Sequence, residues 1–265
     1  MDVLQHNRAA WNRFVQNGNR WTKPVTPETV ARARNMDFEV VLTPTKPVPK
    51  SWFPKLGESR VLCLACGGGQ QGPLLAAAGA SVTVFDNSPQ QLQQDRLVAE
   101  REGLSIDLVE GDMADLSVFA NDSFDLVFNP CSNCFIPDVI PVWNECNRVL
   151  QDEGILMVGF TNPVRYIFDD ERQENGNLEV RYSLPYSDTE SLNKKDLQHF
   201  VDTVQPLEFG HTLDDQIGGQ LKAGFVITDF FEDAYSGADC DPISQYMSTF
   251  IATRARKCSS ATKQP

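Results

Sequence analysis

One stretch of the sequence, Val61 to Asp86, restricts the fold more than any other. It opens with an apolar run, Val61 to Leu64, that is typical of a parallel strand buried on both faces. Glycines at 67–69 follow, then good helix formers up to Ala78, and a second apolar run that ends in Asp86. This order of strand, glycine turn, helix and strand predicts the first half of a nucleotide-binding βαβ unit. In such a unit the N–H groups of the turn face a polar ligand group, and the acid accepts hydrogen bonds from ribose hydroxyls.

The glycine pattern by itself leaves the cofactor open. Gly67, Gly69 and Gly72 satisfy G-x-G-x-x-G, and Asp86 lies about twenty residues further on, as in dinucleotide-binding proteins. Doubly wound methyltransferases that use S-adenosylmethionine share this geometry, and a turn that serves only chain reversal is a third interpretation. The rest of the chain has to decide between them.

Later apolar runs alternate with helix-length segments, which is typical of a parallel, doubly wound α/β sheet. Strands are expected at Ile106 to Val109, Phe124 to Phe128, Ile155 to Phe160 and Phe225 to Phe231. The last strand is expected within Ile243 to Arg256, centred on Met247 to Ala252. Residues 161–210 interrupt the alternation, and we interpret them as an insertion with a strand pair around Leu178 to Ser187. A capping box at Thr212 to Asp215 predicts a helix that ends at Gly224.

The segment before the first core strand, residues 1–57, is expected to form helices at His6 to Gln16 and Thr29 to Arg34. A proline-rich stretch, 42–57, is expected to run over the surface as an extended linker. The tryptophans at 11, 21 and 52 allow two interpretations: they pack against the main domain, or they belong to a lid over the ligand. Residues 257–265 form a polar tail.

Composition excludes several partners. The formal net charge of −13 disfavours an electrostatic contact with nucleic acid or an anionic membrane. The odd number of cysteines, 7, indicates reduced thiols and a cytoplasmic protein, and the sequence holds no apolar run long enough for a signal peptide or a membrane span. The oligomeric state cannot be inferred.

Five motifs in order resemble those of class I S-adenosylmethionine-dependent methyltransferases, most closely the small-molecule branch called type 11 or UbiE-like. They are VLCLACGGGQ, VTVFDNS, EGDMADL, FDLVFN and NRVLQDEGILMVGF. The resemblance covers about residues 58–256. It implies a seven-stranded, mostly parallel sheet with an antiparallel last strand, S-adenosyl-L-methionine as the cofactor and a small-molecule acceptor. Residues 1–57 are expected to be a lid segment over the cofactor and the acceptor, and the insertion at 161–210 is expected to form the acceptor lid.

The resemblance also implies which residues bind the cofactor. They are Ala65, Gly67, Gly69, Gln70, Asp86, Asn87, Asp112, Met113, Asn129 and Pro130. Ala65, Gly67 and Gly69 would lie along the methionine part, Asp86 with Asn87 at the ribose, and Asp112 with Met113 at the adenine. Asn129 and Pro130 would border the sulfonium and the acceptor.

Two positions depart from the family pattern, which usually has an acid where Cys63 stands and a glycine where Ala65 stands. The acid orients the amino group of the methionine. We therefore expect Gln70, Gln71 or the N-terminal segment to take over that contact.

The cysteines and histidines of the chain are possible metal ligands, and a histidine or tyrosine could act as the catalytic base. Cys63-x-x-Cys66 is not expected to bind a metal, because residues three apart on a strand point to opposite faces. No metal site is predicted; Cys131 and Cys134 are expected to be reduced structural thiols, with thiol-redox or metalloid chemistry as the alternative. His211 and Tyr166 are candidates for the catalytic base, although a flanking histidine and a packed tyrosine are the simpler interpretations.

The sequence therefore predicts a methyltransferase that transfers the methyl group to a small molecule by in-line displacement at the sulfonium. An NAD(P)-dependent oxidoreductase is the second hypothesis, but the chain has no Tyr-x-x-x-Lys pair for hydride transfer. A non-catalytic methyltransferase-like binding protein is the third.

Overall fold

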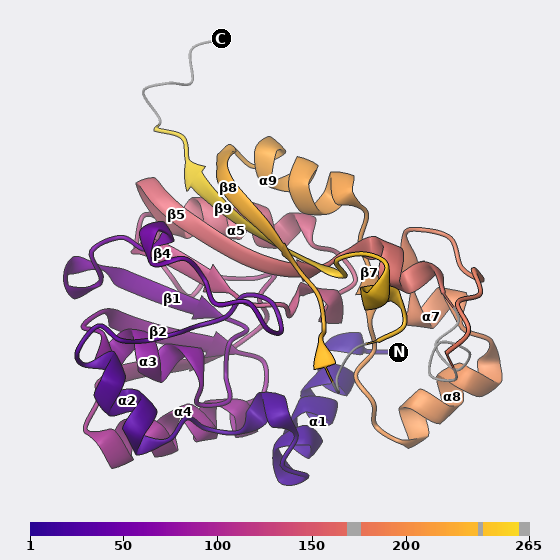
Figure 1. Cartoon of the computed structure of the whole chain (residues 1–265), viewed down its shortest axis with the longest axis horizontal. Coiled ribbons are helices and arrows are strands. Elements are labelled where there is room, and N and C mark those ends of the chain that lie inside the picture. The colour runs from indigo at the N-terminus through magenta and orange to yellow at the C-terminus, as the bar shows by residue number, and fades with distance from the viewer. Residues whose placement is uncertain (169–175, 238–240, 260–265) are drawn as a thin grey trace.

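The computed structural model describes residues 1–168, 176–237 and 241–259, and within them it forms one large sheet of seven strands (Figure 1). Its strand order is β3-β2-β1-β4-β5-β9-β8. The strands are β1 (Arg60–Leu64), β2 (Ser81–Asp86), β3 (Ile106–Glu110), β4 (Phe124–Asn129), β5 (Leu150–Thr161), β8 (Phe225–Asp233) and β9 (Phe250–Lys257). β9 is antiparallel to both β5 and β8, and the pairs among β1 to β5 are parallel. The doubly wound, seven-stranded fold with an antiparallel last strand is confirmed.

Helices cover both faces of this sheet. The α-helices are α1 (Val3–Gln16), α2 (Pro27–Ala33), α3 (Gln71–Ala77), α4 (Pro89–Glu102), α5 (Ile140–Val149), α7 (Asp188–Ser191), α8 (Lys194–Asp202) and α9 (Gly219–Lys222). Apolar side chains of α2, α3 and α4 form the core on one face, and those of α5 form it on the other. Short helical turns are η1 (Arg20–Thr22), η2 (Lys50–Trp52), η3 (Leu56–Glu58), η4 (Asn133–Phe135), η5 (Pro163–Ile167), η6 (Asp214–Gly218) and η8 (Ile243–Gln245).

Local sequence signals explain where several helices begin and end. Ser88 caps α4 by accepting a hydrogen bond from the N–H of Gln91, and Gly103 ends the helix in the left-handed conformation. Thr26 caps α2 in the same way, with Pro27 at its first position, as expected. The capping box also forms, because Thr212 and Asp215 exchange side-chain to backbone hydrogen bonds of 3.1 Å.

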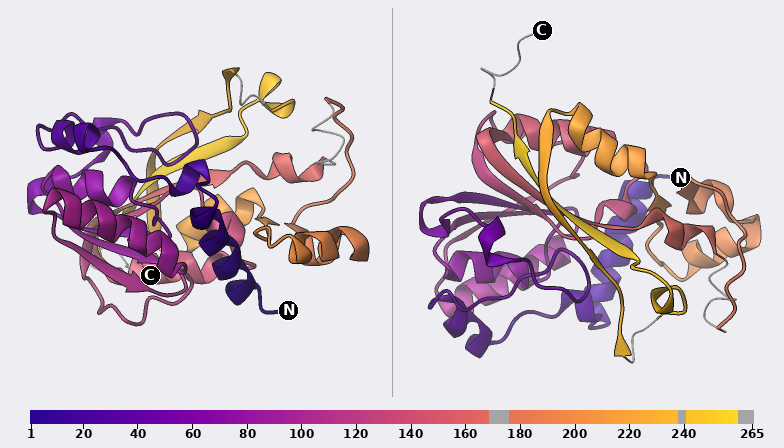
Figure 2. Two further views of the ribbon diagram at one scale, coloured as in Figure 1. Left: turned by 90° about the horizontal axis from the view of Figure 1, so that it is seen from below. Right: turned by 45° about the horizontal axis from the view of Figure 1, so that its top comes forward.

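α1 lies between α4 and the segment that carries α8 (Figure 2). It begins at Val3, three residues before the expected start, because Asp2 caps it by accepting a hydrogen bond from the N–H of Gln5. On the other side, His6 Nε2 is 2.7 Å from the carbonyl oxygen of Gln205. The N-terminal helix therefore bridges the main domain and the insertion.

Residues 42–57 run along the surface only in part: Thr45, Lys46 and Lys50 are exposed, but apolar side chains of the segment are buried, so the prediction of a surface linker is wrong in that respect. Leu42, Val48 and Trp52 are buried in the core on the α2–α4 face. The segment passes directly over β5: a Cβ built on Gly159 would lie only 1.9 Å from the carbonyl oxygen of Leu42. Burial of its apolar side chains outweighs the preference of a proline-rich segment for a surface position.

Other differences lie in the C-terminal half. The strand pair expected within Leu178 to Ser187 is wrong: β6 (Tyr186–Ser187) instead pairs with the distant β7 (Phe209–Gly210) in a separate two-stranded sheet. η6 begins the helix after the capping box as a π-helical turn. The last strand, Phe250–Lys257, lies in the C-terminal part of the stretch expected to hold it, so its centre is further along the chain than expected. Beyond Ser259 the polar tail lies outside the described residues.

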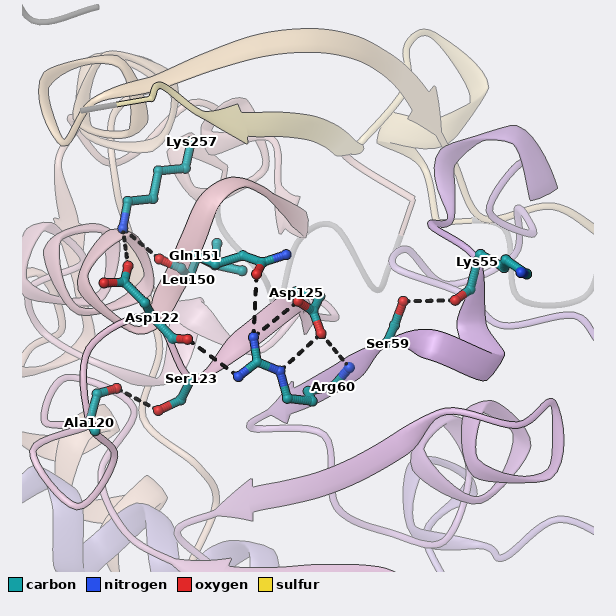
Figure 3. Close-up of polar contacts among 10 residues, drawn as sticks. All are labelled: Lys55, Ser59, Arg60, Ala120, Asp122, Ser123, Asp125, Leu150, Gln151 and Lys257. Atoms are coloured by element: carbon teal, nitrogen blue, oxygen red, sulfur yellow. Dashed lines mark hydrogen bonds and ion pairs between the residues drawn. The ribbon is translucent and has the colours of Figure 1, made fainter. Parts of the chain in front are cut away.

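A polar cluster joins the strands near the amino ends of β1, β4 and β5, as Figure 3 shows. Asp125 Oδ2 accepts hydrogen bonds from the backbone N–H of Arg60 at 2.7 Å and from its Nε at 3.1 Å. Nearby, Lys257 Nζ at the end of β9 donates to Asp122 Oδ1 at 2.9 Å. Ion pairs therefore hold the strands together at this end of the sheet, whereas the cavity lies at the opposite end, where the parallel strands have their carboxyl ends.

Candidate active site

A cavity of about 460 Å³ opens at the carboxyl ends of the parallel strands. Each of the five strands β1 to β5 contributes a residue from its end or the loop just beyond it: Ala65, Asp86, Asp112, Pro130 and Thr161. α1 and η1 cover it with Leu4, Trp11 and Trp21, among others. An open α/β sheet binds its ligand in this crevice.

Asp86 lies half-buried at the end of β2 on the cavity wall. Its Oδ2 accepts a hydrogen bond from the N–H of Gly67 at 2.9 Å, and its Oδ1 accepts one from the N–H of Ser88 at 2.9 Å. Burial raises the pKa of Asp86 to about 6, against the lowering effect of these two hydrogen bonds. A carboxylate has about four lone-pair sites, so each oxygen can accept one further hydrogen bond from a ligand.

Asp112 and Met113 lie beside Asp86 on the cavity wall. The N–H of Gly111, next to Asp112, donates to the carbonyl oxygen of Asp86 at 3.1 Å, which sets the two acids on neighbouring strands. Asp112 Oδ1 accepts from the N–H of Ala114 at 3.0 Å, which fixes the carboxylate in its turn.

Asn87 also lines the cavity and is held by α1. Its Nδ2 donates to the carbonyl oxygen of Leu4 at 3.0 Å, and its Oδ1 accepts from Arg8 Nε at 3.1 Å.

The N–H groups of the glycine turn do not face the cavity, contrary to expectation. That of Gly67 bonds to Asp86, and those of Gly68 and Gly69 both donate to Asp95 Oδ2, at 2.9 and 3.1 Å. Gly69 faces α4: a Cβ there would lie 2.8 Å from the carbonyl oxygen of Gln94, and Gly69 is not among the cavity residues. The turn is thus closed by two of the protein's own acids.

Gln70 and Gln71 line the cavity and attach the N-terminal segment to the glycine turn. Gln70 Nε2 donates to the carbonyl oxygens of Arg20 and Lys23, each at 3.0 Å. Gln71 Oε1 accepts from the N–H of Val41 at 3.1 Å.

Pro130 lines the cavity, whereas Asn129 lies fully buried behind it. Asn129 Nδ2 donates to the carbonyl oxygen of Leu64 at 2.9 Å and to Ser132 Oγ at 3.0 Å. Its role in this structure is to join the ends of β1 and β4.

Gln91 is a cavity residue that sequence reasoning missed. It projects from the first turns of α4 toward the glycine turn, and among the described residues its buried Oε1 has no hydrogen-bond partner. A buried acceptor without a partner is costly, so a ligand N–H or O–H in the cavity would satisfy it. Gly67 fits the same space tightly, because a Cβ there would lie 2.7 Å from Gln91 Cβ.

The two candidates for the catalytic base lie outside the cavity. His211 is buried, its Nε2 is 3.1 Å from the carbonyl oxygen of Asn133, and burial lowers its pKa. Tyr166 stacks on Tyr186, with ring centroids 5.4 Å apart, and donates from its hydroxyl to Glu208 Oε2 at 2.7 Å.

Glu208, the partner of Tyr166, does line the cavity. Asp188 Oδ2 accepts a 2.6 Å hydrogen bond from its N–H, and Asp188 Oδ1 accepts one of 2.7 Å from the Tyr186 hydroxyl. Tyr166 therefore fixes the Glu208 carboxylate, while Asp188, itself held by Tyr186, fixes the Glu208 backbone. Glu208 influences the pKa of Cys131, which places it at a second end of the cavity, on the β4 side, away from β2 and β3.

Arg165 and Tyr235 complete this second end. The Arg165 guanidinium lies 5.6 Å from the centroid of the Tyr235 ring and 5.5 Å from that of Phe250. The pKa of Arg165 is raised: burial lowers it, but the negative charge of Glu208 and neighbouring groups outweighs that effect. The second end thus combines a cation, a carboxylate and aromatic rings.

Cys63 and Cys66 are not on opposite faces, so that expectation is wrong. The strand ends at Leu64, and Ala65 takes a left-handed conformation with φ 46°, which turns Cys66 back. Burial, the neighbouring Cys63 thiol and nearby carboxylates raise the pKa of Cys66 well above its usual value. Among the described residues no group of three or more His, Cys, Asp or Glu side chains is arranged to hold a metal ion.

Comparison with known proteins identifies the family. A family model described as "Methyltransferase domain" matches residues 62–158. The protein named "Uncharacterized methyltransferase YbaJ" from Bacillus subtilis (strain 168) is 48% identical over 255 residues, which cover 96% of this chain and 98% of that protein. The chain belongs to the methyltransferase family. Solved structures that share its fold are described as S-adenosylmethionine-dependent methyltransferases.

More distant relatives agree with the family assignment. A ubiquinone biosynthesis O-methyltransferase from Xanthomonas euvesicatoria is 28% identical over 154 residues, 57% of this methyltransferase and 60% of that protein. The crystal structure of an S-adenosylmethionine-dependent methyltransferase from Mesorhizobium loti has the same fold, with a TM-score of 0.59, 18% identity, and coverage of 78% of this chain and 95% of that one. Within its described residues, this methyltransferase has no helix with the length and apolar character to span a bilayer.

Proposed function

We propose that this methyltransferase transfers the methyl group of S-adenosylmethionine to a small-molecule acceptor. The observation that carries the proposal is the cavity, because it has two chemically different ends under one cover of α1 and η1. A volume of about 460 Å³ falls in the range of small-ligand sites. The insertion and residues 1–57 would serve as the acceptor lids, and the free described thiols agree with a cytoplasmic setting.

The first end fits the cofactor. In the proposal Asp86 accepts hydrogen bonds from the ribose hydroxyls, with Asn87 beside it, while Asp112 and the Met113 backbone receive the adenine. Ala65 and Gly67 line the methionine part, and Gln91 Oε1 gains the donor it lacks. Gly69 and Asn129 act indirectly, by shaping the turn and the strand ends.

The second end would receive the acceptor. Bound S-adenosylmethionine supplies a methyl group on a cationic sulfur, so the protein has to orient the nucleophile and exclude water. Where the nucleophile arrives protonated, the Glu208 carboxylate, oriented by Tyr166, is placed to take the proton. Tyr166 is then a positioning residue, and His211 has no part in the transfer.

Calorimetry with S-adenosylhomocysteine tests the cofactor end. We expect Asp86→Asn and Asp112→Asn to weaken binding by about tenfold each, since each removes a charged hydrogen bond of about 1.5–3 kcal/mol. The exposed Asp107→Asn on β3 is the matched control and should bind normally. Unchanged affinity in both variants, or binding of NAD instead, would contradict the assignment.

Release of S-adenosylhomocysteine over a panel of small-molecule acceptors tests turnover. An acceptor that is methylated should lose rate in Glu208→Gln with its KM less affected. Tight cofactor binding without methylation across the panel would favour a binding protein instead.

A further inference from the structure

Cys131 and Cys134 form a pair of thiols at the acceptor end of the cavity that the proposed transfer does not use. Cys131 follows β4 directly, and Cys134 lies in η4. Both line the cavity, so a small reagent dissolved in it reaches them.

The backbone brings the two side chains together. The N–H of Cys131 donates to the carbonyl oxygen of Leu42 at 2.9 Å, and the N–H of Phe135 donates to that of Ser132 at 3.1 Å, which closes a turn between the cysteines. Each thiol shifts the pKa of the other, so the two groups lie within interaction distance. A third group joins them, because Cys131 Sγ lies 3.4 Å from Thr161 Oγ1.

The surroundings make the two sulfurs unequal. The pKa of Cys131 is lowered, first by the hydrogen bond from Cys134 and then by the Thr161 hydroxyl and the positive charge of Arg165. Burial and the negative charge of Glu208 oppose these effects without cancelling them. The pKa of Cys134 is raised well above its usual value. One nucleophilic thiol next to a second, resolving thiol is the arrangement of a reversible redox pair.

Cys63 and Cys66 provide an internal comparison with the same spacing. Their thiols also influence each other, but the nearby charges are the carboxylates of Asp86 and Asp95 rather than a guanidinium, and the pKa of Cys66 is raised. Cys63 is a residue of β1 and is fully buried in the core. Spacing alone therefore does not make a reactive pair; the hydroxyl of Thr161 and the charge of Arg165 distinguish the second pair.

We infer that Cys131 and Cys134 are a peroxide modification site, which closes to a disulfide in the wall of the acceptor end. The Cys131 thiolate attacks one oxygen of the peroxide: an S–O bond forms, the O–O bond breaks, and the released hydroxide takes up a proton as water. Cys134 then attacks the sulfenic sulfur, the S–S bond forms, and the S–O bond breaks with loss of a second water. Two thiols are oxidised and one peroxide is reduced.

The disulfide would alter the acceptor end alone. Pro130 and Thr161 border the pair there, whereas Asp86 and Asp112 lie on other strands at the cofactor end. Oxidised protein should therefore keep its affinity for S-adenosylhomocysteine and lose acceptor methylation. This consequence for transfer rests on the proposed function; the modification itself does not.

Hydrogen peroxide applied to the reduced full-length protein, followed by differential alkylation and mass spectrometry, tests the site. We expect a reductant-reversible Cys131–Cys134 disulfide, and alkylation of Cys131 by iodoacetamide about tenfold faster than that of Cys63 or Cys66 at neutral pH. Cys131→Ser should abolish the disulfide, Thr161→Val should slow the alkylation, and the control Cys258→Ser should change neither.

Oxidation of Cys63 with Cys66 in preference, or equal alkylation rates at all of these thiols, would overturn the inference. Calorimetry on the same samples separates it from the proposed function. Reduced protein that forms the disulfide but does not bind S-adenosylhomocysteine would refute the proposed function and leave the modification site standing.

Discussion

Asp95 illustrates how one buried side chain determines the shape of the glycine turn. It is fully buried in α4, and its Oδ2 accepts hydrogen bonds from the N–H groups of Gly68 and Gly69. Burial raises the pKa of Asp95 to about 8, with a further contribution from the negative charge of Asp86. The carboxyl group thus supplies the hydrogen bonds that the turn would otherwise seek from a ligand.

This raised pKa predicts how stability depends on pH. Between the unfolded pKa, about 3.9, and about 8 the unfolded state binds fewer protons than the folded state, so the free energy of unfolding falls as the pH rises. The slope attributable to Asp95 is at most about 1.4 kcal/mol per pH unit. Asp95→Asn should flatten the decline in urea denaturation across this range. Identical slopes in the variant and the wild type would rule this out, and Asp107→Asn controls for the lost charge.

At the scale of elements, the side chain of Asn7 holds α1 over the cavity through three hydrogen bonds. Asn7 is buried; its Nδ2 donates to the carbonyl oxygens of Phe135 at 2.8 Å and Leu207 at 2.9 Å, and its Oδ1 accepts from the N–H of Leu207 at 2.8 Å. The edge of Trp11 packs against Phe135, with ring centroids 5.1 Å apart. The cover is therefore fixed to both η4 and the insertion.

Asn7→Ala should loosen this cover. It leaves three buried backbone groups without their partner, which costs about 1–3 kcal/mol of unfolding free energy. Affinity for S-adenosylhomocysteine should fall at the same time, because Leu4 and Trp11 of the same helix line the cavity. Denaturation and calorimetry measure the two effects. Arg13→Ala, which removes an exposed hydrogen bond of α1, is the control; an equal loss of affinity there would contradict the role of Asn7.

At the scale of the whole molecule, the amino ends and the carboxyl ends of the parallel strands have different roles. Ion pairs hold the strands near their amino ends, where Arg60 meets Asp125 and Lys257 meets Asp122. The carboxyl ends form the cavity. Substitutions at the amino ends should therefore alter stability and leave ligand binding unaffected.

Arg60→Ala tests this separation. The side chain of Arg60 is 47% exposed, so solvent screening limits the loss to about 1 kcal/mol of unfolding free energy. The affinity for S-adenosylhomocysteine in calorimetry should stay within error of the wild type. A clear loss of affinity would mean that the ion pairs at the amino ends of the strands also affect ligand binding at the carboxyl ends.

Local patterns predicted the sheet but not the contacts between distant segments. The runs before Ala65 and Asp86 identified buried strands because both faces of those strands are covered. The burial of Trp52, by contrast, depends on contacts with β8 and β9, which are far away in sequence. The sequence offers Tyr166 as a possible base. The pairing of β6 with β7, which joins distant segments, brings Glu208 to the cavity wall instead of Tyr166. The one signal for Asp95 was an acid within the apolar stripe of α4.

The two tryptophans in the cover have a practical consequence. Of the 4 indoles in the chain, Trp11 and Trp21 line the cavity, whereas Trp52 and Trp143 lie in the core. Adding S-adenosylhomocysteine should therefore change the ultraviolet emission of the native protein, and Trp11→Phe with Trp21→Phe should remove most of that optical response. Intrinsic tryptophan fluorescence should therefore report ligand binding, so titrations need no attached dye.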